Sequence, residues 1–415
     1  MNQFVNNAQA LRLHIPEPQC RPGDAPDFGA LRLPPAGGLP RPGFTADEST
    51  LRHLPYALIR VLDDDDAAVG EWRPNLGLER LCEGLRAMML TRAFDEAMQR
   101  AQRKGKASFF IKSTGEEAVA VAQAYALDAR DMLFPSYRQQ GLLIARGWPI
   151  EQMMCQILSN SGDQLKGRQL PTMYSAREAG VFSLSGNLGT QFPQAVGWAM
   201  ASALRGDTRI AASWVGDGTT AEADFHHALT FASVYRAPVI LNVVNNQWAI
   251  SSFAGIAGGE RATFAARAIG YGMAGLRVDG NDFLAVHAAT QWAAERARAN
   301  AGATLIELYT YRAAAHSTSD DPSAYRPREE AAQWPLGDPI ERLKRHLIRC
   351  EAWSESRQQA LQQEVDEQVR AALRQAESLG VIGDTRIERD SLFDDVYKTL
   401  PAHLQAQREQ LRKEG

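Results

Sequence analysis

The chain has 415 residues, of which 45% are hydrophobic and 23% charged, the proportions of a globular protein with a large buried core. Its formal net charge of −4 argues against the strongly basic surface by which many proteins bind nucleic acid. The four cysteines are widely spaced and form no Cys-x-x-Cys pair, so they indicate neither a zinc site nor a redox motif and fit a reducing compartment.

Residues 1–75 differ in composition from the rest of the chain. Proline and glycine are dense between residues 16 and 42, which predicts an extended arm. The first residues lack a basic start and an apolar run of signal-peptide length, and we expect a cytoplasmic protein. A solvated arm does not need many apolar side chains, so we expect the arm to pack on a partner subunit through Leu31, Leu33, Phe44, Leu54, Tyr56, Leu58 and Ile59.

The main domain is expected to occupy residues 76–335. It opens with an amphipathic helix near Leu78, because apolar residues there recur mostly three or four apart. The segment 179–204 is uncharged but rich in small polar residues, which predicts a buried loop and helix and not a membrane span. A short strand is expected at 132–134, and helices are expected at 116–127, 140–146, 150–158 and 194–204.

Strands and helices alternate in the second half of this domain. Strand candidates lie at 209–215, 238–244, 275–278 and 304–310. Helix candidates between them lie at 221–234, 262–270 and 282–299. The alternation predicts an α/β fold with a doubly wound, mostly parallel sheet and helices on both faces. Residues 336–415 should form a helical region whose apolar stripe docks on the domain or on a partner: Leu361, Val365, Val369 and Leu373.

Polar residues directly follow two neighbouring strand candidates. Gly216, Asp217 and Gly218 come after the first, and Asn246 comes after the second. If these strands are parallel neighbours, Asp217 and Asn246 lie at the carboxyl edge of one sheet, where open α/β sheets bind ligands. Magnesium prefers oxygen ligands and takes few of them from carboxylates, and the glycines let the backbone approach a phosphate. The pattern predicts a magnesium-bound diphosphate.

A helix is expected to open directly after these glycines. Thr219 and Glu222 have the spacing of a capping box. The free amides and the positive dipole end of such a helix favour a phosphate. The alternative interpretation is a tight turn followed by an asparagine-rich strand end.

This order of motifs resembles the thiamine diphosphate fingerprint. More widely, residues 109–325 resemble the α subunit of the decarboxylating component of 2-oxoacid dehydrogenases, most closely that of the branched-chain enzyme. The resemblance implies the thiamine diphosphate-binding fold and covers more than half of the chain. It rests on residues 113–118 (STGEEA), 166–171 (KGRQLP), 190–197 (TQFPQAVG) and 311–321 (YRAAAHSTSDD).

The resemblance implies a set of ligands for Mg²⁺ and the cofactor. Asp217, the Asn246 amide and the backbone carbonyl of Trp248 would hold Mg²⁺. Tyr137 and His316 match residues at the catalytic centre, and His316 would help to acylate the lipoyl group. Arg138 would grip the diphosphate and Leu188 would hold the cofactor bent. The full set of implied cofactor contacts is Tyr137, Arg138, Gly186, Leu188, Gly216, Asp217, Gly218, Thr219, Asn246, Trp248 and His316.

The chain departs from the animal members of this family at several positions. Ser185, Thr190 and Gln191 match a loop that binds a monovalent cation, but Asn187 replaces a proline there, and simple hydrogen bonding within the loop is the alternative. Val244 stands where those members have a phosphate-binding arginine, and Arg312 is the candidate to replace it.

A second departure concerns regulation. Ser317 aligns with a regulatory phosphorylation site, and Pro327 occupies the position of the second such site. A phosphate beside Asp320 and Asp321 would be repelled, so we do not expect this regulation.

The activity implied is oxidative decarboxylation of branched-chain 2-oxoacids, with acyl transfer to lipoamide. The chain offers strands for only one α/β domain, so the carboxylate that thiamine enzymes need at the pyrimidine ring is expected from a β subunit in an α2β2 heterotetramer. A lipoyl acyltransferase core would be the second partner. The alternatives are a pyruvate or acetoin dehydrogenase α subunit, a non-catalytic binding subunit that keeps the fold, and a self-sufficient decarboxylase.

Overall fold

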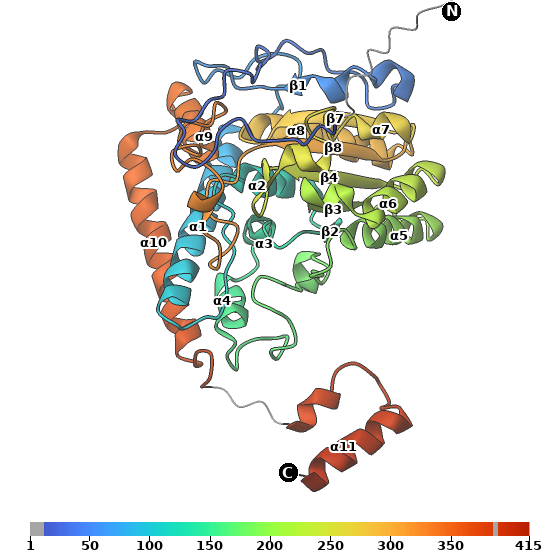
Figure 1. Ribbon diagram of the computed structural model, residues 1–415, viewed down its shortest axis with the longest axis vertical. Helices are drawn as coiled ribbons and strands as arrows, with labels where there is room; N and C mark the ends of the chain where they lie inside the picture. The colour runs from blue at the N-terminus through green and yellow to red at the C-terminus, as the bar shows by residue number, and fades with distance from the viewer. Residues whose placement is uncertain (1–11, 385–388, 415) are drawn as a thin grey trace, which may run out of the picture.

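The computed structural model describes residues 12–384 and 389–414, and its centre is a six-stranded sheet (Figure 1). Every strand pairs with its neighbours in parallel, which confirms the predicted α/β fold. A separate hairpin joins β5 (Trp248–Ala249) to β6 (Ser252–Phe253). The order across the large sheet is β1 (Leu58–Ile59), β7 (Ala274–Asp279), β8 (Thr304–Tyr309), β4 (Val239–Asn245), β3 (Ala211–Gly216) and β2 (Met132–Phe134).

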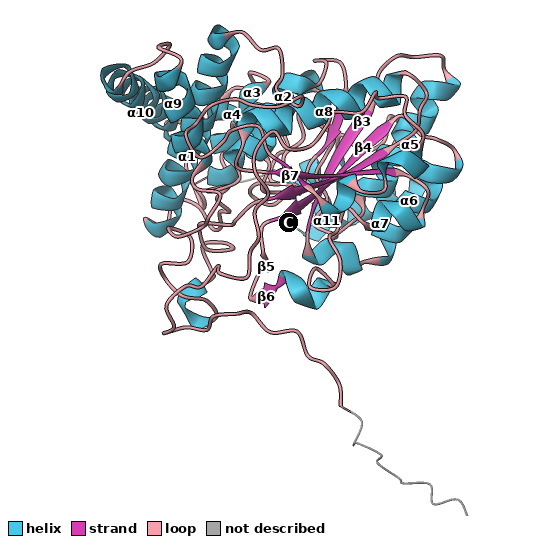
Figure 2. Cartoon of the chain, turned by 90° about the horizontal axis from the view of Figure 1, so that it is seen from above, coloured by secondary structure: helices cyan, strands magenta, loops and turns pink. Residues whose placement is uncertain are grey.

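Alternate side chains of the strands face two different helical layers. Trp214 and Ile240 belong to one apolar cluster, whereas Val215 and Leu241, their neighbours in sequence, belong to the other. A strand buried on both faces favours apolar residues at most positions, which is why these strands are mostly apolar runs. Asn242 in β4 and Glu307 in β8 are buried exceptions that form side-chain hydrogen bonds. Figure 2 shows helices on both sides of the sheet.

The two layers use different helices. The first contains α1 (Leu78–Arg103), α2 (Glu117–Ala126), α3 (Gln140–Ala145), α4 (Ile150–Leu158) and α8 (Phe283–Arg298). The second contains α5 (Gln191–Leu204), α6 (Ala223–Val234) and α7 (Arg267–Gly270). The helix expected at 262–270 is therefore wrong over its first half, because that segment forms successive turns.

The predicted capping box at Thr219 and Glu222 does not form. A short 3-10 helix (Gly218–Ala221) follows β3, and Asp217 caps it by accepting a hydrogen bond from the Gly218 N–H. Glu222 then has extended backbone angles, and its side chain makes no capping bond to α6. The chain thus forms a 3-10 turn, extends at Glu222 and only then begins α6. The Asp217 carboxylate, and not the Thr219 hydroxyl, caps the first of these two helices.

The N-terminal arm packs against this chain's own sheet. Leu54, Leu58 and Ile59 are at most 2% exposed, because β1 adds a strand beside β7. The expectation that these residues pack on a partner subunit is wrong for them, whereas Phe44 and Tyr56 remain exposed. The part of the predicted arm at residues 1–11 lies outside the described residues. The domain boundaries at 75 and 335 stay predictions.

The C-terminal region is helical, with α9 (Pro339–Arg349), α10 (Glu355–Glu377) and α11 (Ala402–Glu414). The stripe on α10 docks on α1 and α4 of the same chain, with Leu361, Val365 and Val369 buried and Leu373 half-buried. Figure 1 shows α10 running along α1 at the side of the molecule. No helix in the described part of the chain is long and apolar enough to cross a membrane.

Candidate active site

A cavity of about 520 Å³ lies at the carboxyl ends of β3 and β4. The register pairs Gly216 with Val244, so the residues that follow the two strands emerge side by side. Every residue that the sequence predicted to contact the cofactor lines this one cavity: Tyr137, Arg138, Gly186, Leu188, Gly216, Asp217, Gly218, Thr219, Asn246, Trp248 and His316. Their individual roles stay predictions.

Asp217 brings a buried carboxylate to this cavity. The residue is only 1% exposed, and burial raises the pKa of its carboxyl group to about 6. The Oδ1 atom accepts from the Gly218 N–H at 2.7 Å, whereas Oδ2 has no hydrogen-bond partner. A buried carboxylate oxygen without a partner is costly unless a cation or a donor completes it. This oxygen therefore fits a metal ion.

Asn246 is held from two sides. Its Nδ2 donates to Glu116 Oε1 at 2.6 Å, and its Oδ1 accepts from the Trp248 backbone N–H at 3.2 Å. Asp217, the Asn246 amide oxygen and the Trp248 carbonyl offer the hard oxygen donors that Mg²⁺ takes, with only one carboxylate among them. Among the described residues, no group of three or more His, Cys, Asp or Glu side chains could hold a metal ion.

Glu116 was not among the predicted site residues, although it lines the cavity. It is 2% exposed, and burial raises its pKa to about 7 despite the nearby Arg138 guanidinium, whose Nε lies 3.6 Å from Oε1. Its other oxygen, Oε2, has no partner. The available signal was its place in residues 113–118, one of the segments that carried the family resemblance.

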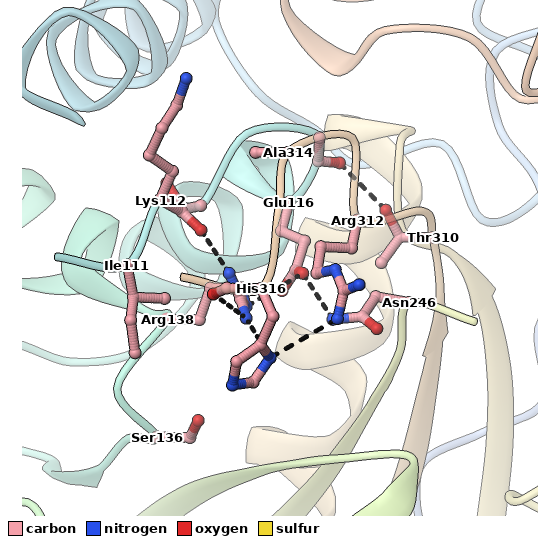
Figure 3. Close-up of polar contacts among 12 residues, drawn as sticks. Ile111, Lys112, Glu116, Ser136, Arg138, Asn246, Thr310, Arg312, Ala314 and His316 are labelled. Atoms are coloured by element: carbon pink, nitrogen blue, oxygen red, sulfur yellow. Dashed lines mark hydrogen bonds and ion pairs between the residues drawn. The ribbon is translucent and has the colours of Figure 1, made fainter. Parts of the chain in front are cut away.

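Three basic side chains, those of Arg138, Arg312 and His316, gather around Glu116 (Figure 3). Arg138 Nη2 lies 3.3 Å from His316 Nδ1, and Arg312 Nη1 lies 3.5 Å from the same nitrogen. Arg312 also donates to the Trp248 carbonyl at 2.9 Å, which leaves that oxygen its second lone pair. Arg138 lines the cavity, where a guanidinium can meet a diphosphate. Arg312 is fully buried behind the lining and also donates to the Ile250 carbonyl and the Tyr325 hydroxyl, so its role as the replacement phosphate ligand stays a prediction.

His316 is neutral in this setting. Burial, together with the Arg138 and Arg312 guanidiniums, lowers its pKa to about 4. Because guanidinium nitrogens only donate hydrogen bonds, Nδ1 faces them as an acceptor and the ring proton belongs on Nε2. The Tyr137 ring meets the imidazole edge to face, with centroids 5.9 Å apart.

The loop predicted as a monovalent cation site is tied together by its own hydrogen bonds. Thr190 Oγ1 donates to the Asn187 carbonyl at 2.9 Å, and the Asn187 N–H donates to Ser185 Oγ at 3.1 Å. Gln191 Nε2 donates to the Trp214 carbonyl at 2.9 Å. Ser185 and Gln191 line the cavity and Thr190 does not. Binding of a monovalent cation stays a prediction.

One wall of the cavity is apolar and was not predicted. It comes from the β5–β6 hairpin and the turn after it, and its side chains are Ala249, Ile250, Phe253, Ala254, Ile256 and Ala257. The hairpin strands are two residues each, too short for a sequence pattern to mark them. Leu188 faces the same cavity and is 52% exposed.

Known proteins match this chain along most of its length. The model of the family described as dehydrogenase E1 component matches residues 85–382, and that of the 2-oxoisovalerate dehydrogenase E1 alpha subunit N terminal matches residues 9–49. The 2-oxoisovalerate dehydrogenase subunit alpha of Pseudomonas aeruginosa is 59% identical over 98% of this chain and 100% of its own length.

More distant relatives agree with this match. The mitochondrial 2-oxoisovalerate dehydrogenase subunit alpha of Mus musculus is 38% identical over 82% of this chain and 76% of its own length. The 3-methyl-2-oxobutanoate dehydrogenase subunit alpha of Mycobacterium tuberculosis is 40% identical over 79% of this chain and 85% of its own length. The chain therefore belongs to the dehydrogenase E1 component family, among its 2-oxoisovalerate dehydrogenase α subunits.

Proposed function

We propose that this chain is the thiamine diphosphate-binding α subunit of a branched-chain 2-oxoacid dehydrogenase, which decarboxylates 2-oxoisovalerate and transfers the acyl group to lipoamide. The observation that carries the proposal is the unpartnered Oδ2 of Asp217, buried beside Asn246 at the carboxyl edge of the sheet. The 59% identity to the Pseudomonas aeruginosa α subunit supports the same activity.

The residues divide the binding task by charge. Asp217, the Asn246 amide oxygen and the Trp248 carbonyl would hold Mg²⁺, and Arg138 would contact the diphosphate from the cavity lining. Arg312, buried behind the lining, would add positive charge there. When bound, thiamine diphosphate supplies the electron sink for decarboxylation. Gly216, which has no neighbouring atom within 4 Å of an added Cβ, leaves room for the cofactor to approach the backbone.

His316 would serve acyl transfer because its imidazole is neutral. With Nδ1 engaged by the guanidiniums, Nε2–H is the group available to donate a proton, and the low pKa keeps the ring from competing with them as a cation. Tyr137 holds the edge of the ring. These positions support the proposed catalytic pair of His316 and Tyr137.

The cavity also explains why a β subunit is needed. The carboxylates that line it are Glu116 and Asp217, and both belong to the metal end, where Glu116 engages Asn246. The carboxylate for the pyrimidine ring must therefore come from a partner, which we propose is a β subunit in an α2β2 heterotetramer that delivers acyl groups to a lipoyl acyltransferase core. The cysteines of the described chain are all free, which supports a reducing, cytoplasmic location.

A substrate panel tests the activity. The α chain co-purified with its β subunit is expected to prefer 2-oxoisovalerate over pyruvate and acetoin, because the cavity wall is apolar. Faster turnover of pyruvate would assign the chain to a pyruvate dehydrogenase instead. Carbon dioxide release by the α chain alone would contradict the need for a β subunit.

Asp217 tests the site itself. Asp217→Ala should weaken Mg²⁺-dependent binding of thiamine diphosphate to the assembled complex by about 100-fold or more, because a charged ligand is lost. Binding can be followed by isothermal titration with and without Mg²⁺. Asp207→Ala, at an exposed-loop aspartate paired with Arg209, is the matched control and should bind like the wild type. Equal binding by the Asp217 variant would overturn the proposed site.

A further inference from the structure

The Glu116 side chain lines the cavity and forms a hydrogen bond to one of the proposed metal ligands. Its Oε1 accepts from Asn246 Nδ2 at 2.6 Å, across 130 positions of sequence. Both residues are more than nine-tenths buried, so water does not replace this bond at low cost. Figure 3 shows Glu116 between Asn246 and Arg138.

The orientation of the Asn246 amide decides whether it can bind a cation. An asparagine amide presents oxygen on one side and NH₂ on the other, and only the oxygen is a metal ligand. A carboxylate only accepts hydrogen bonds, so it selects the NH₂ group for its own side. The Trp248 N–H, a donor, selects the oxygen for the other side, at 3.2 Å. The two neighbours therefore enforce the same orientation.

Glu116 has an orphaned second oxygen, which separates it from an ordinary core residue. Among the described residues, Oε2 has no hydrogen-bond partner. Arg138 Nε lies 3.6 Å from Oε1, close enough for an ion pair but too far for a hydrogen bond. The adjacent Glu117 differs, because it pairs with Arg92 at 2.7 Å and accepts from the Gly115 N–H at 2.9 Å. Two neighbouring buried glutamates thus have separate tasks, one at the site and one in the scaffold.

We propose that Glu116 is a positioning residue that holds the Asn246 amide with its oxygen toward Mg²⁺. This inference rests on the proposed function, since it concerns the same metal site. Glu116 does not itself ligate the ion; it acts through Asn246. Loss of its acceptor oxygen should leave the amide free to turn, so that the NH₂ group faces the metal part of the time.

Two substitutions distinguish the effect of the hydrogen-bond acceptor of Glu116 from that of its negative charge. Glu116→Gln keeps a carbonyl oxygen that can accept from Asn246, whereas Glu116→Met keeps the length and removes the acceptor. In the α/β complex, Glu116→Met should raise the Mg²⁺ concentration needed for half-maximal thiamine diphosphate binding about 10- to 100-fold. Glu116→Gln should raise it far less. Equal losses in the two variants would mean that charge, and not orientation, matters, and would overturn the proposal.

A rescue experiment distinguishes positioning from packing. An aspartate at 246 has two equivalent oxygens and no orientation to select, so Asn246→Asp should restore Mg²⁺ affinity in the Glu116→Met background. No rescue would show that Glu116 supports the fold instead, and wild-type affinity in Glu116→Met would also overturn the proposal. Thermal unfolding of each cofactor-free complex checks the fold. If Glu116→Met does not assemble, Glu116→Ala with and without Asn246→Asp gives the same comparison.

Measurements on the wild type and on Asp217→Ala distinguish a failure of this inference from a failure of the proposed function. If the wild-type complex shows no Mg²⁺-dependent binding of thiamine diphosphate, the proposed function fails. If the wild type binds and Asp217→Ala does not, a normal Glu116→Met variant contradicts the role of Glu116 alone. Glu117→Gln is the neighbouring control and should leave the Mg²⁺ requirement unchanged, because Glu117 does not bond to Asn246.

Discussion

Single residues in the cavity owe their chemistry to their immediate neighbours. His316 is an ordinary histidine by sequence, and its neutral state comes from burial and from two guanidiniums that face the same ring nitrogen. Neither Arg138 nor Arg312 is adjacent to it in the chain. A histidine held neutral with a free Nε2–H is suited to proton donation and poorly suited to binding a diphosphate as a cation.

His316→Ala should therefore affect acyl transfer more than cofactor binding. We expect transfer to a lipoylated acceptor to fall about 100-fold, the usual range for loss of a general acid or base. Binding of thiamine diphosphate should change much less, because Arg138 and Arg312 remain. The two readouts are titration of the cofactor and single-turnover transfer to a lipoyl domain of the acyltransferase. Matching losses in both would mean that the residue mainly binds the diphosphate.

At the scale of elements, the turn after β3 packs more tightly than its sequence suggests. A Cβ at Gly218 would lie 2.5 Å from Ala249 Cβ of the β5–β6 hairpin, whereas one at Gly216 would meet no atom within 4 Å. The two glycines look equivalent in the Gly-Asp-Gly motif and both line the cavity, and their contact with a phosphate stays a prediction for each, but only Gly216 has open space where a Cβ would stand. Gly218 instead lets the hairpin close over the turn.

Alanine at each glycine should separate folding from binding. Gly218→Ala should destabilise the protein by about 1–3 kcal/mol, since the new methyl group overlaps Ala249. Gly216→Ala should leave stability nearly unchanged and should weaken thiamine diphosphate binding, because its methyl group enters the cavity. Chemical unfolding of the cofactor-free complex measures the first effect, and cofactor titration the second. A reversed pattern would contradict the assignment of the two glycines.

Across the whole molecule, buried histidines link stability to pH. His287 on α8 is 5% exposed, and burial lowers its pKa from the usual 6.5 to about 4. Between these two values the unfolded chain binds a proton that the folded chain does not. Stability from this residue is therefore intact above pH 6.5 and is lost as the pH falls toward 4.

The size of this effect follows from the difference in pKa. At pH 5 the wild type should lose about 2 kcal/mol relative to neutral pH through His287 alone. His287→Gln does not titrate, so the variant should escape this part of the loss. Urea unfolding of both proteins at neutral pH and at pH 5 measures it, and the difference between them cancels the other titrating groups. A difference that does not change with pH would mean that folding does not lower the pKa of His287.

The sequence alone was sufficient for the features that are local. Mostly apolar runs located β3, β4, β7 and β8 to within about two residues, because a strand buried on both faces favours apolar side chains at most of its positions. Asp217 and Asn246 were found because each directly follows such a run. The local pattern gave a wrong prediction where two groups compete for the same role. The capping box predicted at Thr219 does not form, because the Asp217 carboxylate caps the helix in its place.

Only the tertiary structure decided which distant residues meet. Glu116, which precedes α2, reaches Asn246, which follows β4, and no local pattern encodes a contact across 130 positions. The same holds for the arm, where Leu54, Leu58 and Ile59 are buried against this chain's own sheet. The sequence determines which side chain stands at each position, and so which chemical groups are available. The choice of neighbours is a balance of packing over the whole chain, and it determines which of those groups act together.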